Sequence, residues 1–283
     1  MGKLGERAAR AACAAVLAAA AAGNAAASGH EEQVGAQVEQ LCDARSLAAV
    51  ARFLQVAQPA AFVEPPPGRA PDAGAMIAAS ACRAAPAWQA RLVAVAYRPG
   101  AGEELLLAIA ALDAAGRVTT AFKGSLDSDP SVRIVSGSLW LDTAPLDLAP
   151  GVRAFGLDLT SGAPRGCAGA GSGARRSLFI AQGRFIRPVL QDLPMSEWVL
   201  VQRGRSECTD SSAPEQTITE NFSVSLSLAP TSTRGWRDLV VTGTAARDDD
   251  HLDERPPFHA LLKSNGRGYP QDELRQAWSA WRQ

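Results

Sequence analysis

The spacing of apolar side chains divides the chain into a helical part and a strand part. In residues 31–58 apolar positions recur every three or four residues, which is the period of one face of an α-helix. Pro59 follows this stretch, and residues 64–74 contain too much proline and glycine for regular structure. From Trp88 onward the period falls to two, as in β-strands. The pattern predicts an N-terminal helix within residues 28–63, a linker over residues 64–81 and a β domain over residues 82–283.

Strand-like runs fill most of the predicted β domain. Several are separated by short segments with glycine or asparagine, at residues 113–116, 182–183 and 265–266, where a tight hairpin turn fits. Tight turns join antiparallel neighbours, whereas parallel strands need a crossover of about ten residues or more. We therefore expect a mainly β fold, either an antiparallel sandwich or two abutting sheets, with sub-sheets over residues 82–160 and 161–283. The predicted strands are residues 89–97, 104–112, 117–124, 132–142, 152–160, 176–181, 184–190, 198–203, 220–228, 237–247 and 258–263.

Two short stretches show which faces are buried. In residues 220–230, apolar side chains from Phe222 to Leu228 alternate with serines, so one face of this strand is expected in the core and the other in water. In the last fourteen residues, Leu274, Trp278 and Trp281 fall at i, i+4 and i+7. This spacing predicts a short amphipathic C-terminal helix.

The first residues have the pattern of a secretory signal. Lys3, Arg7 and Arg10 precede an apolar run over residues 11–22, and residues 25–27 then offer three alanines as a cleavage site. We interpret residues 1–27 as a signal peptide and expect a periplasmic or secreted product. The apolar run is shorter than the roughly twenty residues that span a bilayer, so no transmembrane anchor is expected.

Charge argues against a nucleic-acid partner. Removing residues 1–27 leaves 25 basic and 28 acidic residues, a formal charge near −3. A protein that binds the phosphate backbone needs a clustered basic surface, and the nearest pattern is the pair Arg175 and Arg176. We therefore expect no nucleic-acid binding.

Four cysteines remain after this cleavage, which is typical of two disulfides in an exported chain. Three pairings satisfy the count. We favour Cys42 with Cys82 and Cys167 with Cys208, because each pair flanks its own segment with similar spacing. Metal ligation is disfavoured, since no C-x-x-C pair occurs.

Catalytic motifs are missing from the sequence. It contains no G-x-S-x-G, S-x-x-K or H-E-x-x-H, and the glycine-rich residues 169–174 lack the G-K-[ST] of a phosphate-binding loop. The acidic residues 247–255, with His251 among them, could bind a divalent cation, but consecutive acids are also typical of a solvated turn. Asp127 and Asp129 precede Pro130, as in an ordinary turn. We assign no catalytic residue, no metal ligand and no cofactor.

Recognition is expected in loops and at the C-terminal helix. The loops over residues 161–176 and 209–219 are long, and such loops commonly carry binding residues. Trp278 and Trp281 are either a partner contact or core side chains packed on a sheet. The candidate binding-loop residues are Arg165, Arg175 and Arg176.

Three segments resemble a group of uncharacterised exported β-rich proteins of Gram-negative bacteria. They are SLWLDTAPLDLAPGVRAFGLDLTSG (residues 138–162), GRFIRPVL (residues 183–190) and PMSEW (residues 194–198). The resemblance implies export and a shared β fold, and it implies no activity and no site residue.

Together these patterns favour a non-catalytic binding or inhibitory module of the bacterial cell envelope, with an envelope protein or glycan as partner. The alternative is a hydrolase acting on an envelope glycan or peptide. Such an enzyme would need His251 or His259 brought beside a carboxylate by folding.

Overall fold

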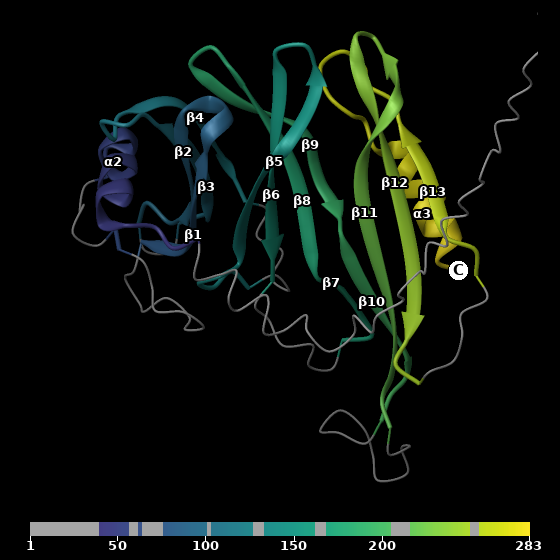
Figure 1. The fold of residues 1–283 in the computed structure, drawn as a ribbon. Coiled ribbons are helices and arrows are strands. Elements are labelled where there is room, and N and C mark those ends of the chain that lie inside the picture. The colour runs from purple at the N-terminus through teal and green to yellow at the C-terminus, as the bar shows by residue number, and fades with distance from the viewer. Residues whose placement is uncertain are drawn as a thin grey trace, which may run out of the picture. The chain divides into compact units, whose positions relative to one another are not determined.

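The computed structural model describes residues 40–56, 62–63, 76–100, 103–126, 133–161, 168–204, 216–249 and 255–283. These residues lie in one unit of the chain, Gln37–Gln283. The unit is mainly β, with two sheets, a helix near its N-terminal end and a short helix at its C-terminus, which confirms the predicted fold class (Figure 1). The elements are α2 (Ala44–Leu54), β1 (Ile77–Ala85), η2 (Pro86–Trp88), β2 (Ala90–Tyr97), β3 (Leu106–Leu112), β4 (Val118–Ser125), β5 (Leu139–Ala149), β6 (Val152–Thr160), β7 (Ala170–Ser172), β8 (Ala174–Gln182), β9 (Phe185–Pro194), β10 (Ser196–Gln202), β11 (Ile218–Thr233), β12 (Trp236–Arg247), β13 (Phe258–Leu262) and α3 (Asp272–Trp281).

The strands form a large and a small sheet. The large sheet has eight strands in the order β1-β2-β3-β4-β9-β8-β6-β5, and the small sheet has five in the order β13-β12-β11-β10-β7. Neighbouring strands are antiparallel, as predicted, except β4 and β9, which are parallel and share the single pair Ala121 and Phe185.

The division between the sheets does not fall near residue 160. The chain leaves the large sheet at Pro194, the end of β9, and enters the small sheet at Ser196, the start of β10. In addition, β7 pairs with β10 in the small sheet before β8 returns to the large one. Alternation along a strand specifies which side chains share a face, and it carries no information about which strand lies alongside.

Helix α2 is shorter than the predicted helix over residues 31–58. Residues 40–43 are not helical, and the Asp43 carboxylate caps the helix by accepting a hydrogen bond from the Ser46 amide at 2.7 Å. At its other end Gln55 adopts a left-handed conformation, with φ 56°. The helix therefore ends before Pro59 is reached.

Strand β1 begins at Ile77, inside the segment assigned to the linker, and the sequence pattern did not predict it. Its residues IAASACRAA are rich in alanine, which has a low strand propensity. Burial explains the strand, because its side chains pack on both faces. Ala79 and Ala81 face the interior of the large sheet, while Ile77 and Cys82 pack beneath α2.

Strand β5 also differs from its predicted range of 132–142. Val135 to Ser138 form a turn, in which the Val135 amide donates to Ser138 Oγ at 3.0 Å. The strand starts at Leu139 and continues to Ala149 through an irregular register with β6.

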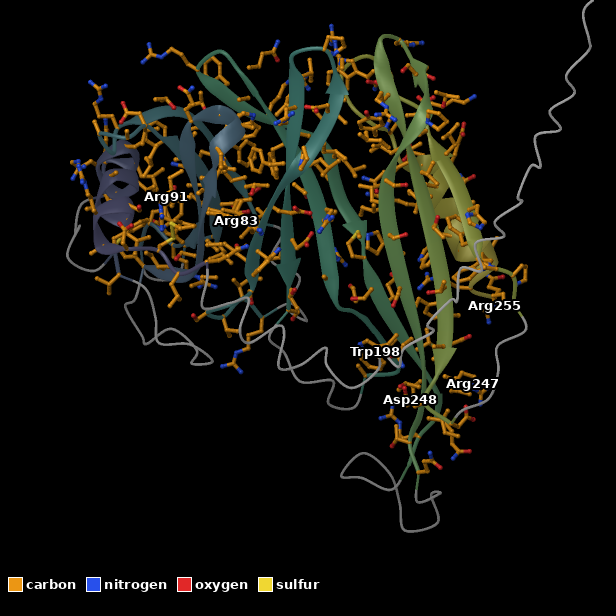
Figure 2. The ribbon with its side chains drawn as sticks, in the orientation of Figure 1. Arg83, Arg91, Trp198, Arg247, Asp248 and Arg255 are labelled. Carbon is orange, nitrogen blue, oxygen red and sulfur yellow. A yellow bond between two sulfur atoms is a disulfide. The ribbon has the colours of Figure 1, made fainter. Side chains whose placement is uncertain are left out.

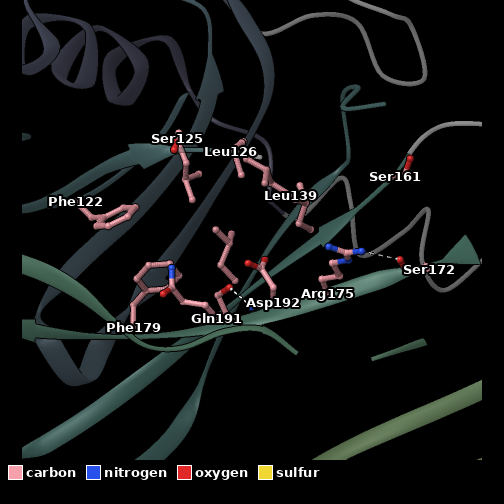
Figure 3. Close-up of a pocket in the computed structure, with 15 residues that line it drawn as sticks. Phe122, Ser125, Leu126, Leu139, Ser161, Ser172, Arg175, Phe179, Gln191 and Asp192 are labelled. Atoms are coloured by element: carbon pink, nitrogen blue, oxygen red, sulfur yellow. Dashed lines mark hydrogen bonds between the residues drawn. The ribbon is translucent and has the colours of Figure 1, made fainter. Parts of the chain in front are cut away.

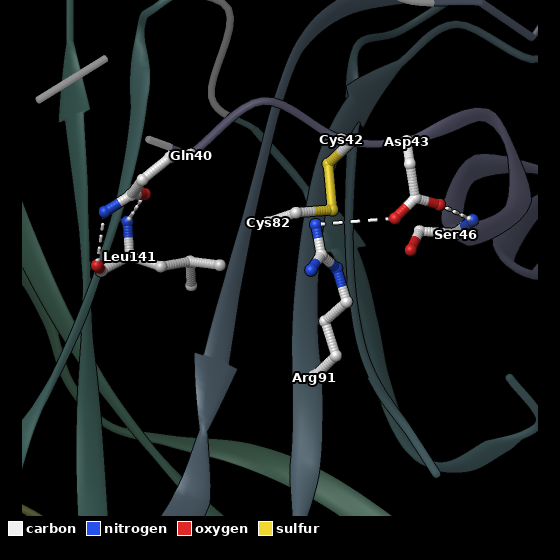
Figure 4. The surroundings of a disulfide bond; sticks show 7 residues. All are labelled: Gln40, Cys42, Asp43, Ser46, Cys82, Arg91 and Leu141. Carbon is white, nitrogen blue, oxygen red and sulfur yellow. Dashed lines mark hydrogen bonds and ion pairs between the residues drawn. A yellow bond between two sulfur atoms is a disulfide. The ribbon is translucent and has the colours of Figure 1, made fainter. Parts of the chain in front are cut away.

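The two edges of the large sheet meet at a seam that involves Gln40 (Figure 4). The Gln40 side chain donates from Nε2 to the Leu141 carbonyl of β5 and accepts from the Leu141 amide, both at 2.8 Å. The Gln40 carbonyl accepts from the Cys82 amide of β1 at 2.7 Å. Beside this seam Cys42 and Cys82 form a disulfide, with their sulfur atoms 2.13 Å apart, which confirms the first predicted pair. Cys167 and Cys208 lie outside the described residues, so the second pair stays a prediction.

The small sheet packs one face on the rest of the unit and turns the other outward. Phe222 is 1% exposed, and Val224, Leu226 and Leu228 pack with it on a core shared by both sheets and α3. The serines between them, Ser223, Ser225 and Ser227, are exposed. The predicted burial of residues 220–228 is confirmed.

Candidate functional site

A cavity of about 260 Å³ opens in the large sheet where β4 and β9 diverge. These strands share one ladder pair and a hydrogen bond of 3.4 Å from the Ala121 amide to the Arg184 carbonyl. Further along, the two strands border the cavity from opposite sides, β4 through Ser125 and β9 through Gln191 and Asp192. We call this feature the β4–β9 cavity.

The β4–β9 cavity has an apolar floor and a polar rim (Figure 3). Its floor continues the interior core of the large sheet, and its rim carries hydroxyl, amide and charged groups. This combination is typical of sites that hold small molecules. The floor residues are Leu107, Phe122, Leu126, Leu139, Leu157, Leu159 and Phe179, and the rim residues are Ser125, Ser161, Ser172, Arg175, Ser177, Gln191 and Asp192.

A β-bulge places Asp192 on the rim. Arg176 pairs with Leu193 and Leu178 with Leu190, so Ser177 alone stands opposite two residues of β9. Asp192 adopts a left-handed conformation, with φ 53°, and its amide donates to Ser177 Oγ at 3.1 Å. Aspartate tolerates this conformation better than most residues, although it is still uncommon. Bulges and strained backbone occur preferentially beside functional sites.

Arg175 and Arg176 point to opposite faces, because successive side chains of a strand alternate. Arg175 lies on the cavity rim, and its Nη2 donates to Ser172 Oγ at 3.2 Å. Arg176 pairs with Asp158 at 2.7 Å and with Asp142 at 3.3 Å, and its hydrogen bonds to Asp158 raise the pKa of its guanidinium. The structure therefore brings only Arg175 to the cavity. Arg165 lies outside the described residues.

Asp192, Gln191 and Ser177 were not among the site residues predicted from the sequence. The signal was a break in the alternation of β9, where the polar pair Gln191-Asp192 separates Leu190 from Leu193. An extra residue in a strand produces such a break, but only the pairing with β8 identifies it as a bulge.

The acidic run is described only at its start, near the end of β12 (Figure 2). Asp248 accepts hydrogen bonds from the side chains of Thr219 and Asn221, and Asp249 pairs with Arg247 at 2.7 Å. Residues 250–254, including His251, lie outside the described part of the chain, as do Asp127 and Asp129. Within the described residues, no group of three or more histidine, cysteine or acidic side chains is placed to hold a metal ion.

His259 lies on the exposed side of the edge strand β13. Its Nδ1 is 3.5 Å from Thr242 Oγ1, and it does not line the β4–β9 cavity. Among the described residues it has no carboxylate partner. The structure therefore places no acid–base pair at His259.

Helix α3 packs on the small sheet through Trp278, which is 6% exposed. Its indole Nε1 donates to Glu197 Oε2 at 2.6 Å, and its ring stacks on Trp281 at 4.9 Å. Arg282 also pairs with Glu197, at 2.9 Å. Burial assigns Trp278 to the core and leaves Trp281 half-buried at the surface.

A larger hollow of about 590 Å³ lies between β13 and α3. Its rim carries Arg234, Lys263, Asp272 and Glu273, all exposed. It lies at the edge strand β13, and no β-bulge interrupts the described pairing of β13 with β12 on its border, unlike at the β4–β9 cavity. We therefore take the β4–β9 cavity as the candidate functional site.

Comparison of the chain with protein-family models, with curated proteins and with solved structures finds no match in any of the three. In the described ranges, neither helix has the length and apolar character needed to cross a bilayer.

Proposed function

We propose that this protein is a non-catalytic binding module of the bacterial cell envelope, and that its ligand site is the β4–β9 cavity. One observation carries the proposal. The cavity joins an apolar floor to a rim on which Arg175 and Asp192 form no ion pair within the described part of the chain. An apolar site with a few convergent polar groups is the usual form of a small-molecule site.

The lining of the cavity favours binding over hydrolysis. It contains serines, one arginine and one aspartate, and no histidine is among its described lining residues. A serine needs an adjacent base to act as a nucleophile. Among the described residues, Ser172 Oγ accepts from the Arg175 guanidinium and Ser177 Oγ from the Asp192 amide, so neither is bonded to the Asp192 carboxylate. The hydrolase alternative therefore has no support at this site.

Export from the cytoplasm is part of the same proposal. The predicted signal peptide and the resemblance to exported proteins support it. The Cys42–Cys82 disulfide adds support, because such bonds persist chiefly in oxidising compartments.

The proposal is tested with benzyl alcohol, a neutral probe with an apolar ring and one polar group. Titration of the ¹⁵N-labelled protein should shift the amide resonances of cavity residues such as Ser125, Phe179 and Gln191. Leu159→Trp, which adds bulk to the half-buried lining, should abolish these shifts without changing the rest of the spectrum. The matched control Leu261→Trp changes an exposed leucine of β13 and should leave binding intact. Shifts that are absent from the cavity, or that persist in Leu159→Trp, would refute the proposal.

A further inference from the structure

We infer that the ligand of the β4–β9 cavity is a small zwitterion with an apolar body, of the class of an apolar α-amino acid. This inference rests on the proposed function and adds the charge and size of the ligand. It depends on two opposite charges that border one cavity and remain available to a bound molecule.

Several arginines of the described residues are neutralised by an aspartate, and Arg175 is not among them. Arginines such as Arg153, Arg176 and Arg247 each pair with an aspartate at 2.6–2.7 Å. Arg175 and Asp192 border the same cavity, yet neither has an ion-pair partner among the described residues. The Arg175 guanidinium bonds the neutral Ser172 hydroxyl, and at Asp192 the backbone amide, not the carboxylate, bonds Ser177 Oγ. Neither side-chain charge is therefore compensated within the described part of the chain.

The charge of the rim then selects the ligand. A simple anion is attracted to Arg175 and repelled by Asp192. A simple cation is attracted to Asp192 and repelled by Arg175. A molecule with both charges gains from both residues, since the guanidinium binds carboxylates through paired hydrogen bonds and the carboxylate accepts from an ammonium group. The rim therefore favours a zwitterion over an acid or an amine with the same apolar body.

The size of the cavity limits the apolar body. Its 260 Å³ corresponds to about nine water molecules at roughly 30 Å³ each. This is slightly below the range of about 300–1,000 Å³ for drug-sized ligands. A single ring or short branched chain fits, and a diacyl lipid does not. The rings of Phe122 and Phe179 pack against each other, with centroids 5.4 Å apart, and line one end of this volume (Figure 3).

The Arg175 side chain and the Asp192 backbone are held in place before the ligand arrives. Ser172 accepts a hydrogen bond from the Arg175 guanidinium, and the bulge opposite Ser177 fixes the backbone of Asp192. Preorganised groups lose less conformational freedom on binding than mobile ones. The bulge therefore serves to present Asp192 to the ligand.

The test compares three probes with the same phenyl body. L-Phenylalanine carries both charges, 3-phenylpropionate only the negative one and 2-phenylethylamine only the positive one. Dissociation constants from amide-shift titrations should be at least about tenfold lower for L-phenylalanine than for either single-charge probe. A tenfold difference corresponds to the free energy of one charge-assisted hydrogen bond. Equal or tighter binding of a single-charge probe would overturn the inference. If benzyl alcohol still binds in that case, the inference of a zwitterionic ligand is rejected and the proposed binding function is kept.

Two variants should change the affinities of the two single-charge probes in opposite directions. Misfolding would instead weaken the binding of all three probes. Arg175→Gln should weaken binding of L-phenylalanine and 3-phenylpropionate about tenfold and should tighten binding of 2-phenylethylamine, because it removes a like charge. Asp192→Asn should weaken binding of L-phenylalanine and 2-phenylethylamine and should tighten binding of 3-phenylpropionate, because it removes a like charge. Asparagine also tolerates the left-handed backbone at this position. Arg184→Gln, an exposed residue of the β8–β9 turn, is the control and should change nothing. Parallel loss of all three probes in both variants would contradict the inference.

Discussion

Replacing Gln40 with leucine tests how the large sheet is closed. The Gln40 side chain is 4% exposed and occupies both the amide and the carbonyl of Leu141. Leucine keeps a similar volume and removes both hydrogen bonds. The change therefore isolates the polar contribution of the seam between β1 and β5.

The structure gives the expected magnitude. The Leu141 carbonyl keeps a second partner, because Arg83 Nη1 donates to it at 2.9 Å, so it loses one bond worth about 1 kcal/mol. The Leu141 amide loses its hydrogen bond to Gln40 Oε1 and is left buried, which costs about 1–3 kcal/mol. The free energy of unfolding should therefore fall by about 2–4 kcal/mol.

Urea unfolding followed by far-UV circular dichroism measures this change. Gln276→Leu, on the exposed side of α3, is the matched control and should stay within about 0.5 kcal/mol of the parent. Hydrogen exchange adds a local measurement, because the Leu141 amide should exchange faster in Gln40→Leu. If both leucine variants lose equally little stability and the Leu141 amide remains protected, the seam does not depend on Gln40 and the reasoning is refuted.

Two further predictions concern the same end of the unit. Replacing Cys42 and Cys82 together with alanine opens a link across 40 residues of sequence and should lower the free energy of unfolding by about 4 kcal/mol on the loop-entropy account; urea unfolding that shows no loss would contradict it. Asp43→Ala should cost about 1 kcal/mol at neutral pH through loss of the helix cap. The Ser46 amide lowers the pKa of the Asp43 carboxyl, so this contribution is present above the ordinary aspartate pKa and disappears as acidification protonates the group. Asp43→Asn keeps a cap and should lose this pH dependence, and identical pH profiles for Asp43→Asn and the parent would count against the assignment.

Local pattern was enough to predict much of the secondary structure. Residues 152–160 form β6 with the predicted bounds, and residues 89–97 and 237–247 match β2 and β12 to within one residue. The buried and exposed faces of β11 also agree with the alternation. In each case the signal and the structure depend on the same few neighbouring residues, because the period of a strand is set by its own backbone.

Pattern failed where distant residues determine the local conformation. Strand β1 is rich in alanine and is held as a strand by burial between two cores. The start of α2 is fixed by a chain segment engaged at the seam, through Gln40 and the disulfide of Cys42. Neither the cores nor the seam can be read from the sequence of the element itself.

The sequence by itself determined that this protein is built mainly of strands, where most of them lie, which of their faces are buried, and that Cys42 could pair with Cys82. Only the tertiary structure decided that β4 lies beside β9, that these strands diverge around a cavity, and that Arg175 and Asp192 border it together. The physical reason is that side-chain alternation is a local property of the chain. Strand order and register depend instead on contacts between residues far apart in sequence, and the cavity exists only where two such strands separate.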